Sequence, residues 1–145
     1  MSSRTAARLV VAFAAGGLAT STYLTIAHYT SPTVLACSSR GLVNCEQVTT
    51  SAQSTILGIP VAVLGALWFA AMLVISTPGR WDVPVLHRIR IIGAVVGIAF
   101  AIWLVYAELA IIGAICLWCS ITHVFAFGVL MVVLIEASQA APISE

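Results

Sequence analysis

Four apolar stretches, each long enough to cross a lipid bilayer, constrain this chain more than any other feature. They cover residues 9–29, 56–76, 91–112 and 116–135. A helix needs about 20 residues to cross the roughly 30 Å of hydrocarbon in a bilayer. Because lipid offers the backbone no hydrogen-bond partners, each stretch is expected to be helical. The sequence therefore predicts an all-α integral membrane protein, a four-transmembrane-helix bundle with a loop over residues 30–55.

The composition fits a single membrane domain that covers residues 1–145. Hydrophobic residues make up 61% of the chain and charged residues 8%, with a mean hydropathy of +1.12. An ordinary soluble domain has about 25% charged residues. The net charge of +1 and the scattered arginines offer no basic surface for nucleic acid. The first apolar stretch runs well past the length of a signal-peptide core, so we interpret it as a membrane span.

The arginines predict how the chain is oriented, since the sequence has no lysine. Only Arg40 lies in the loop over residues 30–55. The other five precede the first stretch or lie between the second and third: Arg4, Arg8, Arg80, Arg88 and Arg90. Positive residues concentrate on the cytoplasmic side of membrane proteins. We therefore expect a multi-pass protein of the cytoplasmic (inner) membrane, with both termini cytoplasmic and the 30–55 loop outside.

Four cysteines fall on this outer side. Cys37 and Cys45 lie in the loop, and Cys116 and Cys119 begin the fourth apolar stretch. An oxidising compartment and an even cysteine count favour disulfides. Three interpretations are open: inert structural disulfides, a zinc site with four cysteine ligands, or thiol-disulfide exchange.

The Cys-x-x-Cys spacing of Cys116 and Cys119 favours exchange. A disulfide across so short a loop removes little chain entropy, so it is seldom present for stability. A four-cysteine zinc site usually needs two short-spaced pairs, whereas Cys37 and Cys45 are separated by seven residues. At the first turn of a helix, the positive end of the helix dipole and the unpaired N–H groups favour the reactive thiolate.

A histidine follows the cysteine pair on the same helical face, because His123 lies four residues after Cys119. A histidine inside a span is costly unless it faces the bundle interior or a polar ligand. It would therefore bond another helix or a bound cofactor. Glu108, near the outer end of the third stretch, is either an interfacial carboxylate or a carrier of protons for quinone reduction.

Cysteines on a loop can move, whereas cysteines on a packed helix cannot. This difference suggests a relay in which Cys37 and Cys45 collect electrons from a soluble partner and pass them to Cys116 and Cys119. No metal or nucleotide motif offers an acceptor in the sequence. The expected acceptor is therefore a lipid-soluble quinone held between the helices near Cys119.

The order of these motifs resembles the vitamin K epoxide reductase (VKOR) family. The resemblance rests on "CSSRGLVNCEQVTTS" over residues 37–51, "GIPVAVLG" at the start of the second span and "CLWC" at the start of the fourth. It covers nearly the whole chain and implies the same four-helix bundle. It also implies a membrane oxidoreductase that supports disulfide bond formation.

The resemblance assigns a role to each cysteine. Cys119 would be the thiolate next to the quinone ring, with Cys116 as its resolving partner. Cys45 would form a transient disulfide with Cys116, and Cys37 would exchange with the partner protein. In the DsbB type of membrane enzyme, by contrast, the Cys-x-x-Cys pair comes in the first outer loop, so the order here is reversed.

The resemblance also implies the quinone contacts. In the family, the residue four after the last cysteine and a polar residue near the end of the loop hydrogen-bond the quinone oxygens, which implies His123 and Ser54 here. Ser51 matches a serine of the family, although it would equally cap or orient a short loop helix. Leu57 is a further candidate contact in the same segment. The cofactor implied is a quinone of the menaquinone, ubiquinone or vitamin K type.

The partner implied is a DsbA-like thiol oxidase on the outer side of the membrane. Because the chain ends at Glu145, we expect this partner to act in trans. A DsbA-type couple has a potential of about -120 mV, so it can be reoxidised only by a strong oxidant such as a quinone pool. The alternative from another class is a non-catalytic tetraspan subunit or channel whose disulfides brace the outer loop.

Overall fold

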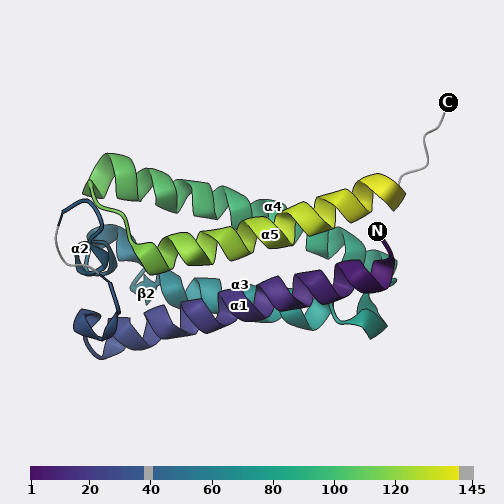
Figure 1. Ribbon diagram of the computed structural model, residues 1–145, viewed down its shortest axis with the longest axis horizontal. Coiled ribbons are helices and arrows are strands. Elements are labelled where there is room, and N and C mark those ends of the chain that lie inside the picture. The colour runs from purple at the N-terminus through teal and green to yellow at the C-terminus, as the bar shows by residue number, and fades with distance from the viewer. Residues whose placement is uncertain (38–40, 141–145) are drawn as a thin grey trace.

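The computed structural model describes residues 1–37 and 41–140, and in it four main helices lie side by side as a bundle (Figure 1). These are α1 (Ser3–Tyr29), α3 (Val61–Ile75), α4 (Pro84–Tyr106) and α5 (Leu117–Ala140). Helix α1 packs against both α3 and α5, and α4 packs against α5. Arg40, which entered the orientation argument, lies outside the described residues.

Short elements connect the four helices. They are η1 (Pro32–Val34), α2 (Cys45–Thr49), η2 (Ala52–Ser54), β1 (Thr55–Ile56), β2 (Ile59–Pro60), η3 (Pro78–Arg80) and the π-helical turn η4 (Ala107–Ile112). The segment with α2 covers one end of the bundle, while the start of α1 and the end of α5 lie at the opposite end (Figure 1). The arginines of α1, η3 and α4 are therefore far from the end that carries the cysteines.

Three of the described helices are long and apolar enough to cross a membrane. They are α1, α4 together with η4 as far as Ile112, and α5 as far as Gln139. Helix α3 has only 15 residues, which at 1.5 Å per residue is about 22 Å and less than the hydrocarbon thickness. The expected spans 9–29, 91–112 and 116–135 thus fall on helices of membrane length, whereas 56–76 contains the shorter helix α3.

The second apolar stretch does not begin as a helix, because its first residues form a tight hairpin. Strands β1 and β2 pair antiparallel, with Ile56 opposite Ile59. The two residues between them, Leu57 and Gly58, have positive φ angles of 52° and 82°, as the two-residue hairpin turn requires. Helix α3 starts only after Pro60, so the prediction of a helix over 56–60 was wrong.

Helix α3 lies close to its two neighbours, α1 and α4. Gly17 of α1 lies against the ring of Phe69, and a methyl group at Gly17 would overlap that ring. On the other side of α3, the Trp68 indole nitrogen donates a hydrogen bond to the Gly93 carbonyl oxygen of α4 at 2.9 Å. Helix α3 is therefore held to α1 by packing and to α4 by a partly buried hydrogen bond.

A buried arginine closes the end of the bundle opposite the cysteines. Arg90 is 0% exposed, and its guanidinium lies 4.1 Å from the centre of the Trp81 ring. It donates to the carbonyl oxygens of Ile75 and Arg80, at 2.9 and 3.5 Å, and to that of Trp81. These carbonyls lie at the end of α3 and in the turn after it, where helix carbonyls lack internal partners.

Replacing Arg90 should therefore destabilise the protein. We expect Arg90→Met to lower the free energy of unfolding by about 2–4 kcal/mol, because buried carbonyls lose charged hydrogen-bond donors. Arg88→Met is the matched control, since Arg88 is exposed on the same helix. Thermal unfolding of the two detergent-purified variants measures the difference, and equal melting temperatures would contradict this role of Arg90.

Candidate active site

The four cysteines form two disulfides at one end of the bundle. Cys37 is bonded to Cys45, with the Cα atoms 6.0 Å apart, and Cys116 to Cys119, with the Cα atoms 5.1 Å apart. Cys45 and Cys116 are 1% and 0% exposed and belong to the same buried cluster. Cys37 and Cys119 pack against this cluster and are only partly buried. The structure thus brings together cysteines from the loop and from the start of α5.

Main-chain hydrogen bonds hold the loop beside the start of α5. The N–H of Ile115 donates to the Leu42 carbonyl oxygen at 2.8 Å, and the N–H of Asn44 donates to the Ile115 carbonyl oxygen at 3.0 Å. They form a parallel bridge between Val43 and Ile115. Since Cys45 directly follows Asn44 and Cys116 directly follows Ile115, this bridge puts the two buried cysteines next to each other.

Helix caps and aromatic contacts support the same arrangement. The Asn44 side chain accepts a hydrogen bond from the Gln47 N–H at 3.0 Å, which caps α2 and fixes Cys45 as its first residue. Tyr23 of α1 meets Trp118 edge to face, with ring centroids 4.8 Å apart. Both side chains bond the main chain at Ala36, next to Cys37. The loop cysteines are therefore tied to α1 and α5.

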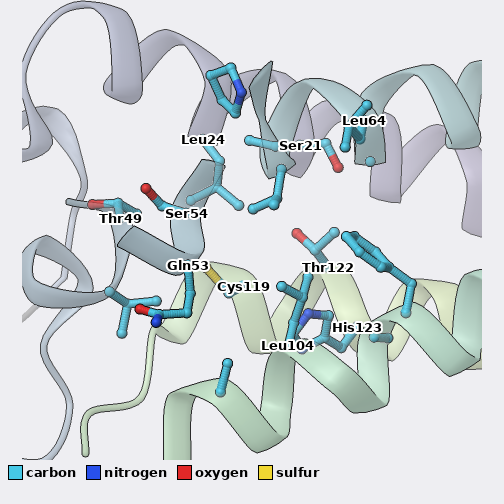
Figure 2. Close-up of a pocket in the computed structure, with 18 of the residues that line it drawn as sticks. Ser21, Leu24, Thr49, Gln53, Ser54, Leu64, Leu104, Cys119, Thr122 and His123 are labelled. Atoms are coloured by element: carbon cyan, nitrogen blue, oxygen red, sulfur yellow. The ribbon is translucent and has the colours of Figure 1, made fainter. Parts of the chain in front are cut away.

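A cavity of about 310 Å³ lies beside Cys119, between the helices and the loop (Figure 2). This volume falls at the lower end of the roughly 300–1,000 Å³ that small-molecule sites occupy. Among the four cysteines, only Cys119 lines it. Apolar residues dominate the walls, and the polar or titratable ones are Ser21, His28, Thr49, Ser51, Gln53, Ser54, Glu108, Cys119, Thr122 and His123.

Two buried polar atoms on the cavity walls lack a hydrogen-bond partner within the described chain. They are Nδ1 of His123 on α5 and Oγ of Ser21 on α1. An unsatisfied polar group in an apolar environment costs about 1–3 kcal/mol. Figure 2 shows His123 and Cys119 on α5, facing the loop residues Gln53 and Ser54 across the cavity. A ligand with polar atoms could satisfy groups that the protein leaves unpaired.

The predicted quinone contacts from the loop have different surroundings. The Ser51 hydroxyl donates to the Val48 carbonyl oxygen and the Ser54 hydroxyl to the Ser51 carbonyl oxygen, each at 2.7 Å. Both residues line the cavity, but each must give up its present bond to donate to a ligand. Leu57 is not among the described residues that line the cavity. Its side chain is 99% exposed at the hairpin tip, away from the site.

Glu108 is buried, so its interpretation as an interfacial carboxylate was wrong. Its side chain is 5% exposed, lines the cavity and accepts a hydrogen bond from the Cys116 N–H at 3.1 Å. Glu108 lies within the π-helical turn η4, whose departure from the α-helical register periodicity alone does not reveal. A carboxylate in an apolar stretch was the one available signal of a buried role.

Five further polar or titratable residues of the cavity were not predicted from the sequence: Ser21, His28, Thr49, Gln53 and Thr122. The Thr122 hydroxyl lies 2.9 Å from the Trp118 carbonyl oxygen and 3.0 Å from the Thr20 hydroxyl. Polar side chains within spans tend to face the bundle interior, which could have marked Ser21 and Thr122. Gln53 lies in η2 and carries no comparable signal in the sequence.

The comparison with known proteins agrees with this geometry. The family model described as "Vitamin K epoxide reductase family" matches residues 8–134, a range that includes all four cysteines and every residue that lines the cavity. None of the curated proteins compared with the chain matches it. The match covers nearly the whole chain, and proteins of this family are oxidoreductases. The chain with its two cysteine pairs beside an apolar cavity therefore belongs to the vitamin K epoxide reductase family.

Proposed function

We propose that the protein is a membrane thiol-disulfide oxidoreductase that reoxidises a DsbA-like partner and passes the electrons to a quinone. One observation carries the proposal. Both disulfides pack at one buried cluster, and Cys119 of the Cys116–Cys119 pair lines an apolar cavity. Disulfides that only braced the loop would not need such a cavity. The family membership supports the same class of chemistry.

Electrons would enter at the loop pair. A thiolate of the reduced partner attacks the Cys37–Cys45 disulfide, and the partner leaves as a disulfide while both loop cysteines become thiols. The half-buried position of Cys37, compared with the buried Cys45, supports Cys37 as the atom attacked. The loop pair then holds two electrons and two protons.

The next exchange would pass the electrons to the helix pair. Cys45 attacks Cys116, which forms a Cys45–Cys116 disulfide and releases Cys119 as a thiolate. Cys37 then attacks Cys45, which restores the loop disulfide and releases Cys116. The contact of Cys45 and Cys116 in one cluster supports this order. At the first turn of α5 the helix dipole favours the Cys119 thiolate.

The cavity residues fit a quinone as the final acceptor. The walls are mainly apolar, as a quinone ring requires, and His123 Nδ1 is a buried polar atom without a partner. When bound, a quinone supplies a two-electron acceptor. His123 would hold one quinone oxygen by a hydrogen bond, with Ser54 or Ser21 at the other. Loop elements α2 and η2 would keep water away from Cys119.

We further propose that the bundle spans the cytoplasmic membrane four times. The hairpin β1–β2 would extend the short helix α3 to the outer interface. The concentration of arginines at the end opposite the cysteines supports a cytoplasmic location for both termini. The cysteines would then face the compartment in which a DsbA-like partner acts in trans.

Cys119→Ala tests whether the Cys116–Cys119 pair passes electrons to the quinone. We expect quinone reduction by the reduced partner to fall to the uncatalysed background, because no thiolate would remain at the cavity. Absorbance of the purified protein with menadione follows the reaction. Ser138→Ala, at the other end of α5, is the control and should keep full turnover. Unchanged turnover in Cys119→Ala would refute the relay.

Cys45→Ser separates the two halves of the relay. The variant should lose turnover with a reduced DsbA-like protein, because the loop pair can no longer pass electrons on. It should retain most of its turnover with dithiothreitol, which is small enough to reduce the helix pair directly. An equal loss with both reductants would count against a loop pair that acts only as the partner's entry point.

His123→Phe tests the quinone contact. We expect the KM for menadione to rise about tenfold, the equivalent of one hydrogen bond of about 1.4 kcal/mol. Exchange between the cysteine pairs should be unchanged. His87→Phe is the control, since His87 pairs with Glu136 at the opposite end of the bundle. An unaltered KM in His123→Phe would remove His123 from the binding site.

A further inference from the structure

Glu108 has no part in the relay above, yet it is the only carboxylate among the described residues that line the cavity. It is 5% exposed, and its Oε2 atom accepts the Cys116 N–H at 3.1 Å. The described arginines all lie at the opposite end of the bundle, so no cation of the described chain pairs with it. A carboxylate buried in a membrane span is costly, so its presence there indicates a functional role.

Main-chain hydrogen bonds fix the backbone at Glu108 in the turn that leads to the cysteine pair. The carbonyl oxygen of Glu108 accepts hydrogen bonds from the N–H groups of Gly113 and Ala114, the latter at 3.1 Å. Gly113 has a φ of 71°, a left-handed conformation that lets the chain turn back after η4. This turn returns Cys116 to the Glu108 side chain, so the position of the carboxylate relative to Cys116 is fixed by its own backbone.

The burial of Cys116 makes a proton acceptor necessary. Its side chain is 0% exposed, so a thiol at Cys116 has no direct contact with water. The backbone nitrogen and Sγ of a cysteine are only three bonds apart, and Oε2 of Glu108 is already bonded to that nitrogen. A small side-chain rotation would therefore bring the carboxylate to the thiol.

We propose that Glu108 accepts the thiol proton of Cys116 as the Cys116–Cys119 disulfide closes, and delivers it through the cavity to the electron acceptor. The inference rests on the proposed function and adds the route of one proton to it. The carboxylate faces both Cys116 and the cavity, which is what such a transfer requires.

The step balances in atoms and electrons. The S–H bond of Cys116 breaks and one S–S bond forms with the Cys119 thiolate, so the cysteine pair loses two electrons and one proton. The proton of Cys116 moves to Glu108 and then to one oxygen of the quinone. The second proton, which Cys45 gave up to solvent when it attacked Cys116, reaches the other oxygen from solvent, and the acceptor leaves as the quinol. Glu108 returns to its carboxylate form and is ready for the next cycle.

Other titratable groups near this site must be separated from Glu108. His28 of α1 and Cys119 and His123 of α5 line the same cavity, and Cys45 and Glu46 lie on α2, which packs against η4. Glu46 is exposed and does not line the cavity, so Glu46→Gln is the matched control. The test variant is Glu108→Gln, whose amide oxygen can still accept the Cys116 N–H but cannot take up a proton.

The experiment follows disulfide closure in reduced, quinone-free, full-length protein. Closure is started with menadione and separately with diamide, a thiol oxidant that needs no quinone, and is followed by timed thiol alkylation and mass spectrometry. Glu108→Gln should close about tenfold or more slowly with both oxidants, since general-base catalysis typically contributes 10²–10⁴-fold. Glu46→Gln should close at the wild-type rate. Closure of Glu108→Gln at the wild-type rate would overturn the proposal.

A second variant separates proton transfer from positioning. Formate should accelerate closure in Glu108→Ala, because a small carboxylate can enter the vacated space and take the proton, and it should not affect wild type. Slow closure without rescue by formate would assign Glu108 a positioning role and refute the proton route. If the wild-type protein closed with diamide but not with menadione, the quinone function itself would fail, independently of Glu108.

Discussion

The parallel bridge between Val43 and Ile115 is the contact on which the rest of the site depends. It joins the outer loop to the chain just before α5, and a buried cysteine follows on each side: Cys45 two residues after Val43 and Cys116 one residue after Ile115. Together with the hydrogen bond from the Trp118 indole to the Ala36 carbonyl oxygen, it fixes the position of the loop relative to the Cys-x-x-Cys pair. Thiol-disulfide exchange needs sulfur atoms that meet at short range, so the bridge is the structural condition for a relay between the pairs.

The second constraint comes from the membrane, which favours apolar walls and makes every polar group inside them costly. The cavity keeps Ser21, Glu108 and His123 within such walls. His123 and Ser21 lack partners in the described chain, while Glu108 has the Cys116 N–H. These polar groups thus line the same cavity as Cys119, where proton and electron transfer would occur together.

Much of this fold could be predicted from the length of the apolar stretches, because lipid leaves the backbone little choice but a helix. The exception is the second stretch, where positive φ at Leu57 and Gly58 replaces the first helical turn by a hairpin. Apolar content cannot distinguish the two, since both strands are hydrophobic. The spacing of Cys116, Cys119 and His123 pointed to one helical face, whereas the buried Glu108 lies in a π-helical turn that the apolar pattern does not reveal. The roles of the quinone contacts stay predictions, and Leu57 lies outside the cavity.

The most direct test of the account is to trap the disulfide that links the two pairs. In a Cys37→Ala/Cys119→Ala double variant, the only remaining cysteines are Cys45 and Cys116, which pack in the same cluster. Mild oxidation followed by peptide mass spectrometry should reveal an intramolecular Cys45–Cys116 disulfide in most molecules. If Cys45 and Cys116 instead remained free thiols, or formed only intermolecular bonds, electrons could not pass between the pairs as proposed here.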